Sequence, residues 1–381
     1  MKMLGVALLA LGAGIAGTTV AQSKGSLAMV SDPPLPPSSD GLVVDFVPGQ
    51  VQCNGGPAVA MRTERPFPVW ALGLAGARAV AIDVTFRIDG DGRPLGIAAG
   101  KQPDFPGPRL YHSSDDVLPA FAAWRFASGQ PRTGCRMRFD PVAVPMAEAP
   151  VALLRRYYVA PHTRGGDEAA MFRRIHAPDT DCIESGVPQV RMRAYPAFET
   201  VPQAPGTWSY SMTGFDIDRR GKPVRVRLLE SGGNPVLDRV SLAAVRRSRF
   251  APAARQGCTY PYYRNATTAM AAPPSPDQAM FRPKDAQCPE TALTFSSPLR
   301  FPAGFDRRRI EGWAIIGYDV APWGATGNVR VLAAEPAAAF GEQAQRVVQS
   351  GRQAAASTGR TGCVDIVRFV MPKDVPPVRE E

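Results

Sequence analysis

The chain has 381 residues, of which 45% are hydrophobic and 20% are charged, values that are ordinary for a globular protein. This length suggests about two to four domains, and the 39 prolines, which lie mostly in connecting stretches, favour several small domains over one large core. The net charge is +10, but no basic stripe interleaved with aromatic residues is present, so nucleic acid is not expected as a partner. The short run Arg307-Arg308-Arg309 is interpreted as exposed surface.

The N-terminal segment has the layout of a secretory signal peptide. One positive charge at Lys2 precedes an apolar run, and small residues before and at Ala21 form a cleavage site. We therefore predict a signal peptide over 1–21, followed by a Pro-rich linker over 22–41. An uncleaved membrane anchor is the alternative, because the apolar run approaches the ~20 residues that span a bilayer.

The six cysteines mark an internal repeat. No C-x-x-C or zinc spacing is present, and an even number of cysteines in an exported chain indicates disulfides. The cysteines form three pairs at nearly equal intervals, and each pair encloses an aromatic-Pro dipeptide and then an aromatic-x-[Ile/Val]-x-x-x-Gly motif. Landmarks that recur in one order at one spacing predict a three-fold repeat. Each repeat is therefore expected to contain one disulfide, which gives Cys53–Cys135, Cys182–Cys258 and Cys288–Cys363.

The second copy shows the elements of one repeat most clearly. Alternating apolar residues predict two strands joined by a hairpin in which Gly221 takes a positive φ. Ser231-Gly232 ends the second strand, Asn234 or Asp238 caps a helix, and Pro252 stops the chain after it. The apolar positions predicted to face the core are Phe215, Ile217, Val224, Val226, Leu228, Leu237, Val240, Ala244 and Phe250.

We expect an α+β fold of three tandem small modules, each a short antiparallel sheet packed by one or two helices and stapled by its disulfide. The expected modules are named the first, second and third repeats, and a linker separates each from the next. Their ranges are 42–145, 168–265 and 277–376, with linkers over 146–167 and 266–276.

The pattern resembles the TonB C-terminal domain family. The second copy carries the closest match: Tyr195-Pro196, Asp218 to Gly221, Ser231-Gly232, Leu237-Asp238 and Phe250-Ala251-Pro252-Ala253. The third copy keeps Phe301-Pro302 and the hairpin but lacks the Leu-Asp and Phe-x-Pro elements. The resemblance implies a small antiparallel sheet with one or two helices, a periplasmic location, and partners that pair with an edge strand.

Several features differ from the energy-transducing members of that family. The N-terminal apolar segment contains no histidine, the linker from Ser31 to Gly41 is short, and cysteine pairs and tandem copies are unusual among family members. Binding in the periplasm is therefore favoured over energy transduction. A transducer anchored in the inner membrane and facing the periplasm is the alternative.

Motifs for catalysis, cofactors and metals were sought and none was assigned. His112 begins the run HSSDD, but neighbours in sequence do not make a triad and no G-x-S-x-G elbow is present. Asp89 and Asp91 lie in a hairpin turn without the remaining ligands of a calcium loop. Trp323 is the tryptophan expected to be exposed as a contact residue, since it lies in the third hairpin turn.

The sequence therefore predicts a non-enzymatic, exported protein-binding or scaffold protein that uses strand addition. The expected partner is a periplasmic or outer-membrane protein, with no small-molecule cofactor, and contact with the membrane is expected only if the N-terminal segment is uncleaved. The strand leading to Cys258 is the favoured binding edge, because it follows the helix. An exported hydrolase of unknown type is a third hypothesis.

Overall fold

A computed structural model describes residues 41–71, 79–100, 114–161, 168–176, 178–183, 188–289 and 293–372. The predicted signal peptide, nearly all of the linker over 22–41, His112 and His162 lie outside these ranges. The described residues all belong to one compact unit, Pro37–Glu381. Contacts between the repeats within this unit are therefore part of the fold.

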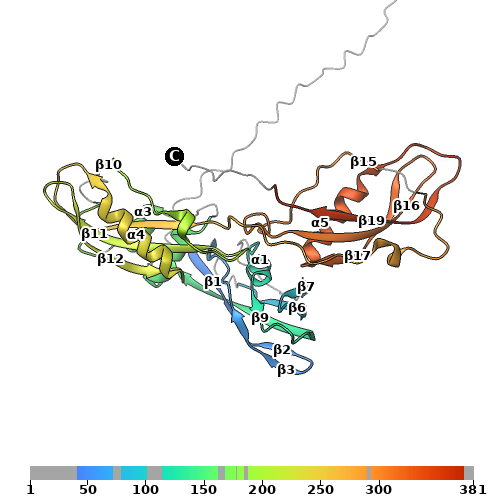
Figure 1. Cartoon of the computed structure of the whole chain (residues 1–381), viewed down its shortest axis with the longest axis horizontal. Helices are drawn as coiled ribbons and strands as arrows, with labels where there is room; N and C mark the ends of the chain where they lie inside the picture. The colour runs from blue at the N-terminus through green and yellow to red at the C-terminus, as the bar shows by residue number, and fades with distance from the viewer. Residues whose placement is uncertain are drawn as a thin grey trace, which may run out of the picture. The chain divides into compact units, whose positions relative to one another are not determined.

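The same arrangement of elements occurs three times (Figure 1). In each repeat a central strand pairs with the next strand in a hairpin and, on its other edge, with the last strand of the repeat. The three sheets have the orders β7-β6-β9, β12-β11-β14 and β17-β16-β19. Their strands are β6 (Ile82–Ile88), β7 (Pro94–Ala99), β9 (Arg132–Pro145), β11 (Ser209–Ile217), β12 (Pro223–Ser231), β14 (Arg255–Arg264), β16 (Gly312–Val320), β17 (Thr326–Glu335) and β19 (Arg360–Phe369). The α+β fold of small antiparallel modules is confirmed.

A helix and a two-stranded ribbon complete each repeat. The helix follows the hairpin. A two-residue strand directly after the helix pairs with a short strand that precedes the hairpin. The helices are α1 (Val117–Ala122), α4 (Pro235–Arg247) and α5 (Ala338–Gln349). The ribbons are β4 (Ala60–Arg62) with β8 (Arg125–Phe126), β10 (Val190–Met192) with β13 (Arg249–Phe250), and β15 (Thr294–Phe295) with β18 (Gly351–Arg352).

The hairpin glycine of each repeat is required by its surroundings. Gly221 has φ +79°, and a Cβ there would lie 2.1 Å from the carbonyl oxygen of Phe250. The close approach allows the Phe250 N–H to donate to the Gly221 carbonyl at 2.9 Å. Gly92 and Gly324 have the same positive φ and receive the same bond, from Phe126 and Gln353. In each repeat the hairpin turn is therefore hydrogen-bonded to the segment directly after the helix.

Side-chain hydrogen bonds begin helix α4 as the sequence indicated. The Asn234 side chain accepts from the Leu237 N–H at 3.1 Å and so satisfies a free donor of the first turn. Asp238 lies in that first turn, where its carboxylate accepts from the Ser231 hydroxyl at 2.6 Å. The strand end and the helix start are thereby tied together.

Of the predicted core positions, Phe215, Ile217, Leu237 and Ala244 are buried, and Val224, Val226 and Phe250 are half-buried. Two other positions need corrections. Val240 is only half-buried, because the buried face of α4 runs instead through Leu237, Ser241, Ala244 and Val245. Leu228 is 40% exposed. Its neighbour Leu229 packs against the core, since the register between β11 and β12 shifts at this point.

Three disulfides join the cysteines within the repeats: Cys53–Cys135, Cys182–Cys258 and Cys288–Cys363. The second cysteine of each bond is paired in register with the aromatic residue of the central strand. The register partners are Phe86 with Cys135, Phe215 with Cys258, and Tyr318 with Cys363. Each bond thus ties the entry of its repeat to the middle of its sheet.

The first repeat has a larger sheet than the others. Strand β9 pairs with β6 along its first half and with β1 (Leu42–Pro48) along its second half. Further strands β2 (Val51–Cys53), β3 (Gly56–Ala58) and β5 (Val69–Ala71) extend this sheet. The larger sheet provides a surface on which the next segment packs.

The interval 146–167, expected to be a linker, contains a helix. Helix α2 (Val151–Val159) is followed by α3 (Glu168–Ile175), and the two contact one another. Leu154 and Tyr157 of α2 are fully buried in a cluster with Met171 of α3. Two short 3₁₀ turns, η1 (Phe198–Thr200) and η2 (Gln278–Phe281), complete the described helical elements.

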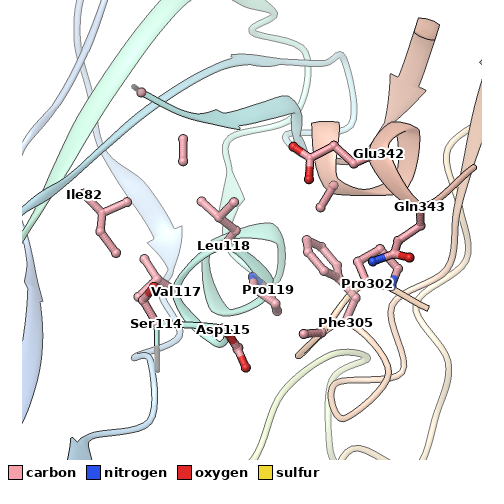
Figure 2. Close-up of a pocket in the computed structure, with 14 residues that line it drawn as sticks. Ile82, Ser114, Asp115, Val117, Leu118, Pro119, Pro302, Phe305, Glu342 and Gln343 are labelled. Carbon is pink, nitrogen blue, oxygen red and sulfur yellow. The ribbon is translucent and has the colours of Figure 1, made fainter. Parts of the chain in front are cut away.

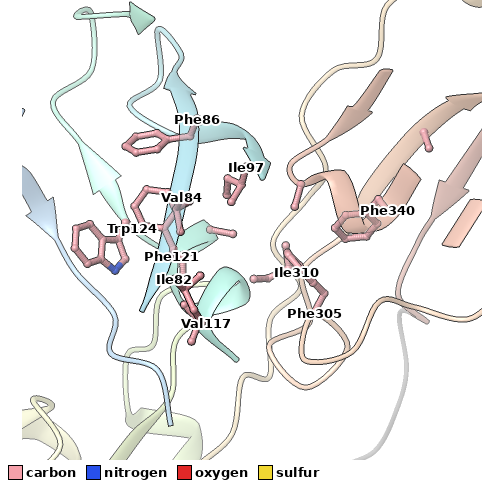
Figure 3. Packing of buried hydrophobic residues seen from close by; sticks show 14 of the residues in the cluster. Ile82, Val84, Phe86, Ile97, Val117, Phe121, Trp124, Phe305, Ile310 and Phe340 are labelled. Carbon is pink, nitrogen blue, oxygen red and sulfur yellow. The ribbon is translucent and has the colours of Figure 1, made fainter. Parts of the chain in front are cut away.

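The first and third repeats share one buried core (Figure 3). The cluster includes Phe86 and Phe121 from the first repeat and Phe305 and Phe340 from the third. Strand β7 also joins the third repeat through its backbone, since the Ile97 N–H donates to the Pro336 carbonyl at 2.9 Å. The first and third repeats therefore pack as one body, in contrast to the separate cores that the proline-rich connections favoured.

All three repeats meet at Arg308, which is 1% exposed although the sequence predicted surface for this run. Its guanidinium donates to both carboxylate oxygens of Asp116 at 2.6 Å. It also contacts Glu64 at 3.2 Å, the Gly206 carbonyl at 3.3 Å, and the ring of Phe67. The prediction was wrong because the charge of Arg308 is neutralised by carboxylates that are distant in sequence.

Candidate functional site

Strand β14 is an edge of the second sheet, because it pairs with β11 on one side and has no named strand on the other in the described part of the chain. The strand contains Pro261. A proline lacks the N–H that a central strand needs, so its presence is typical of an edge. The sequence prediction that this strand lies at an edge therefore agrees with the topology.

A groove of about 340 Å³ follows this edge. Six consecutive β14 residues line it, from Cys258 to Tyr263. Since successive strand residues point to opposite faces, the groove reaches both faces of the strand. We name it the β14 groove.

The walls of the β14 groove come from elements on both sides of the strand. Tyr158 at the end of α2, together with Phe172 and His176 at α3, forms one wall. Phe215, Val245 and Phe250 supply apolar surface from the sheet, α4 and β13, beside the Cys182–Cys258 disulfide. Helices α2 and α3 thus supply one wall of the groove beside the edge of β14.

The lining of the groove is mainly apolar and aromatic, and its described part carries no acidic residue. None of the described residues that line it is an aspartate or glutamate. Arg193 stacks over the ring of Tyr260 at 4.5 Å and donates to its hydroxyl at 2.5 Å. Among the described lining residues, His176 is the one other basic side chain.

Burial favours the neutral forms of Tyr262 and His176 in the groove. Burial raises the pKa of Tyr262 to about 12, and the Tyr262 hydroxyl donates to the Ala194 carbonyl at 3.1 Å. Burial also lowers the pKa of His176, which outweighs the hydrogen bond of 2.7 Å between its Nδ1 and the Phe172 carbonyl. The groove therefore offers aromatic faces, tyrosine hydroxyls and one cation, Arg193.

A second cavity, of about 280 Å³, lies between the first and third repeats (Figure 2). Its floor is apolar and includes Ile82, Val117 and Phe305, while Asp115 and Glu342 lie among its lining residues. No histidine or cysteine is present in its described lining, and no group of three potential metal ligands occurs in the described ranges. The β14 groove remains the better candidate, because it combines a cavity with an open strand edge.

The residues predicted from the family motif lie mainly in the framework of the second repeat. Pro196 is buried, while Tyr195 and Pro252 are exposed. Asp218 accepts from the N–H groups of Arg220 and Lys222 and so shapes the hairpin. These contacts form turns and helix ends, and none of the motif residues in this paragraph lines the β14 groove.

The sequence indicated Phe215, Phe250 and Cys258 as core or disulfide residues, and these also line the groove. Other lining residues were not predicted. Tyr158 comes from the segment expected to be a linker, and His176 and Arg193 come from the start of the second repeat, where no element was predicted. The run TYPYYR from Thr259 to Arg264 offered a signal, since four aromatic or proline residues in a row are unusual in a solvated strand. The residues of α2 and α3 come close to β14 only in the folded chain.

Comparison with known proteins bears on the second repeat. A family model described as the Gram-negative bacterial TonB protein C-terminal matches residues 206–265. This segment resembles the TonB C-terminal domain. The matched TonB C-terminal segment contains β11, β12, α4, β13 and β14, which is the sheet and helix that carry the groove edge. No curated protein matches the chain.

The match confirms the family resemblance for the second repeat, and it does not extend over the first or third repeat. It supports a TonB-like role in protein interaction in the periplasm. Within the described residues, no helix is long and apolar enough to cross a membrane. The predicted cleavage after Ala21 falls outside the described ranges.

Proposed function

We propose that the protein is an exported, non-catalytic periplasmic binding protein, and that β14 recruits a partner protein by strand addition. The observation that carries the proposal is the edge of β14 from Cys258 to Tyr263, which pairs with no second named strand in the described residues and has a groove along it. The start of the strand, at Gln256, is already bonded by Asp181. In strand addition, backbone hydrogen bonds supply affinity and side-chain pockets supply selectivity. The edge and the groove provide these two components in one place.

Pro261 limits the backbone part of this interaction. An added strand would find no N–H at that position, so the hydrogen-bond ladder would be interrupted within β14. Side-chain contacts from the groove must then supply much of the affinity. The tyrosines and Phe172 offer large apolar surface at low cost in side-chain entropy.

The first repeat is less suited to the same role. Strand β9 is the equivalent of β14 in the first repeat, and its outer edge is already paired with β1 and β2. The larger sheet of the first repeat and the core that it shares with the third repeat support a scaffold role. We assign binding to the second repeat and support to the first and third.

The test is site-specific photo-cross-linking in the periplasm. A photoreactive phenylalanine analogue is placed at Thr259 in the groove and, as the matched control, at Arg239 on the exposed face of α4. The proposal expects a discrete cross-linked partner band from Thr259 and none from Arg239. Equal products from both positions, or none from Thr259, would overturn it.

An anchored TonB-type transducer for outer-membrane transport is the second candidate, favoured by the description of the matching family. The two candidates differ in the mature N-terminus. Mass spectrometry of the purified protein distinguishes them, because cleavage after Ala21 is required by the exported form and an intact N-terminal segment is required by an anchor.

A further inference from the structure

We propose that one end of the third repeat docks on an anionic phospholipid bilayer. The surface consists of the hairpin turn 321–325, the loop 353–359 and the ribbon of β15 and β18, and we name it the Trp323 surface. It is separate from the β14 groove and does not depend on the proposed strand addition.

Backbone contacts hold the parts of the Trp323 surface together. The Gln353 N–H donates to the Gly324 carbonyl at 2.9 Å, and the Ala356 N–H donates to the Pro322 carbonyl at 2.8 Å. Arg352 of β18 is bridged to Ala325 on one side and paired with Thr294 of β15 on the other. The hairpin turn, the loop and the ribbon therefore form one end of the module.

Large apolar side chains are exposed at this end. Trp323 is 74% exposed and Phe295 is 48% exposed. All five tryptophans of the chain are described, and the other four are buried or half-buried. Exposed small residues, Ala354 to Ala356, surround them in the loop. Tryptophan prefers the interface between water and lipid, because its ring is apolar and its indole N–H remains hydrogen-bonded there.

The charge of this end is complementary to an anionic membrane. Arg352 lies in β18, where it is exposed. The described segments 293–300, 321–326 and 350–359 contain no aspartate or glutamate. The chain as a whole carries a net charge of +10, which adds a long-range attraction to the same surface.

Exposed tryptophan and arginine are also common at protein–protein interfaces. The lipid surface is favoured because the exposed groups lie on a turn and a loop without carboxylates, so uncharged tips can enter the headgroup region while Arg352 contacts a phosphate. Docking on a protein is therefore an outcome of the test that counts against the proposal.

The test is co-sedimentation of the purified full chain with vesicles of phosphatidylcholine alone and of phosphatidylcholine with phosphatidylglycerol. Binding is expected with the anionic vesicles and not with the neutral ones. Arg352→Glu should lower binding by roughly tenfold or more, since one basic residue near such a surface contributes about a factor of five and reversal counts twice. Trp323→Ala should lower it by about fivefold or more.

Matched controls separate this surface from the net charge. Arg239→Glu makes the same charge change on α4, and Met280→Ala removes an exposed apolar side chain elsewhere in the third repeat. Both should bind as the unmodified chain does, with unchanged circular dichroism and melting temperature in every variant. No binding by the unmodified chain, equal losses for Arg352→Glu and Arg239→Glu, or full binding by Trp323→Ala would each overturn the proposal.

Discussion

Arg87 in the first repeat donates to Glu335 in the third repeat at 2.6 Å, across 248 residues of sequence. The second oxygen of Glu335 accepts from the Gly96 N–H at 2.5 Å. The second and third repeats satisfy the corresponding position internally. There Asp216 accepts from the Gly257 N–H and Asp319 from the Gly362 N–H, both at 2.8 Å. The first repeat carries Arg87 instead of aspartate at this position, and the carboxylate that pairs with it, Glu335, belongs to the third repeat.

Replacement of Arg87 by glutamate should weaken the docking of the first repeat on the third. The change places a second carboxylate beside Glu335, and we expect a loss of about 1 kcal/mol, because Arg87 is 46% exposed and solvent screens the pair. Thermal unfolding measures the effect. Arg136→Glu, an exposed arginine on the neighbouring strand β9, is the control and should change stability little; equal losses would contradict a specific role for the pair.

Arg308→Met should destabilise the protein by about 3–5 kcal/mol, because it leaves the buried carboxylates of Asp116 and Glu64 without their cation. Burial raises the pKa of Glu64, against the lowering effect of Arg308, so the variant should also recover some stability as the pH falls and Glu64 is protonated. Denaturant unfolding at two pH values measures both effects. Arg307→Met, the exposed neighbour, should be nearly neutral, and a similar loss in both variants would show that Arg308 is not a buried hub.

Gly221→Ala should cost about 1–3 kcal/mol from its positive φ alone, and more from the contact between the new Cβ and the Phe250 carbonyl. Gly92→Ala should behave in the same way, since its Cβ would lie 2.2 Å from the Phe126 carbonyl. Gly90→Ala is the control from the same kind of turn, because a Cβ there meets nothing within 4 Å. Melting temperatures of the three variants test the ranking, which fails if Gly90→Ala is as harmful as the others.

The pH dependence of stability should contain a component from His176. Its folded pKa lies below the ordinary value of 6.5 because it is buried, so the unfolded chain binds the proton more readily. The contribution of His176 is fully present above pH 6.5 and is lost as the pH falls towards its folded pKa. Melting temperatures at about pH 7.5 and about pH 5.5 should therefore differ less in His176→Gln than in the unmodified chain. Identical differences would show that His176 does not titrate in this way.

The sequence by itself determined the features that depend on neighbours in the chain. The glycine at the hairpin, the Asn234 cap and the Ser231-Gly232 strand end are local requirements of φ or of free backbone donors, so their residue types are readable directly. The recurring interval between the cysteines also predicted the repeat and its three disulfides. The family resemblance of the second repeat rests on these local features.

Only the tertiary structure decided which charges are buried and which edges are open. Arg308 reads as surface among three arginines, yet it is buried because Asp116 and Glu64 come to it from the first repeat. The β14 groove exists because α2, in a segment expected to be a linker, and α3, at the start of the second repeat, supply residues beside the edge strand. Neither outcome is visible in the sequence, because the free energy of burying a charge or covering an edge is set by partners that only folding brings into contact.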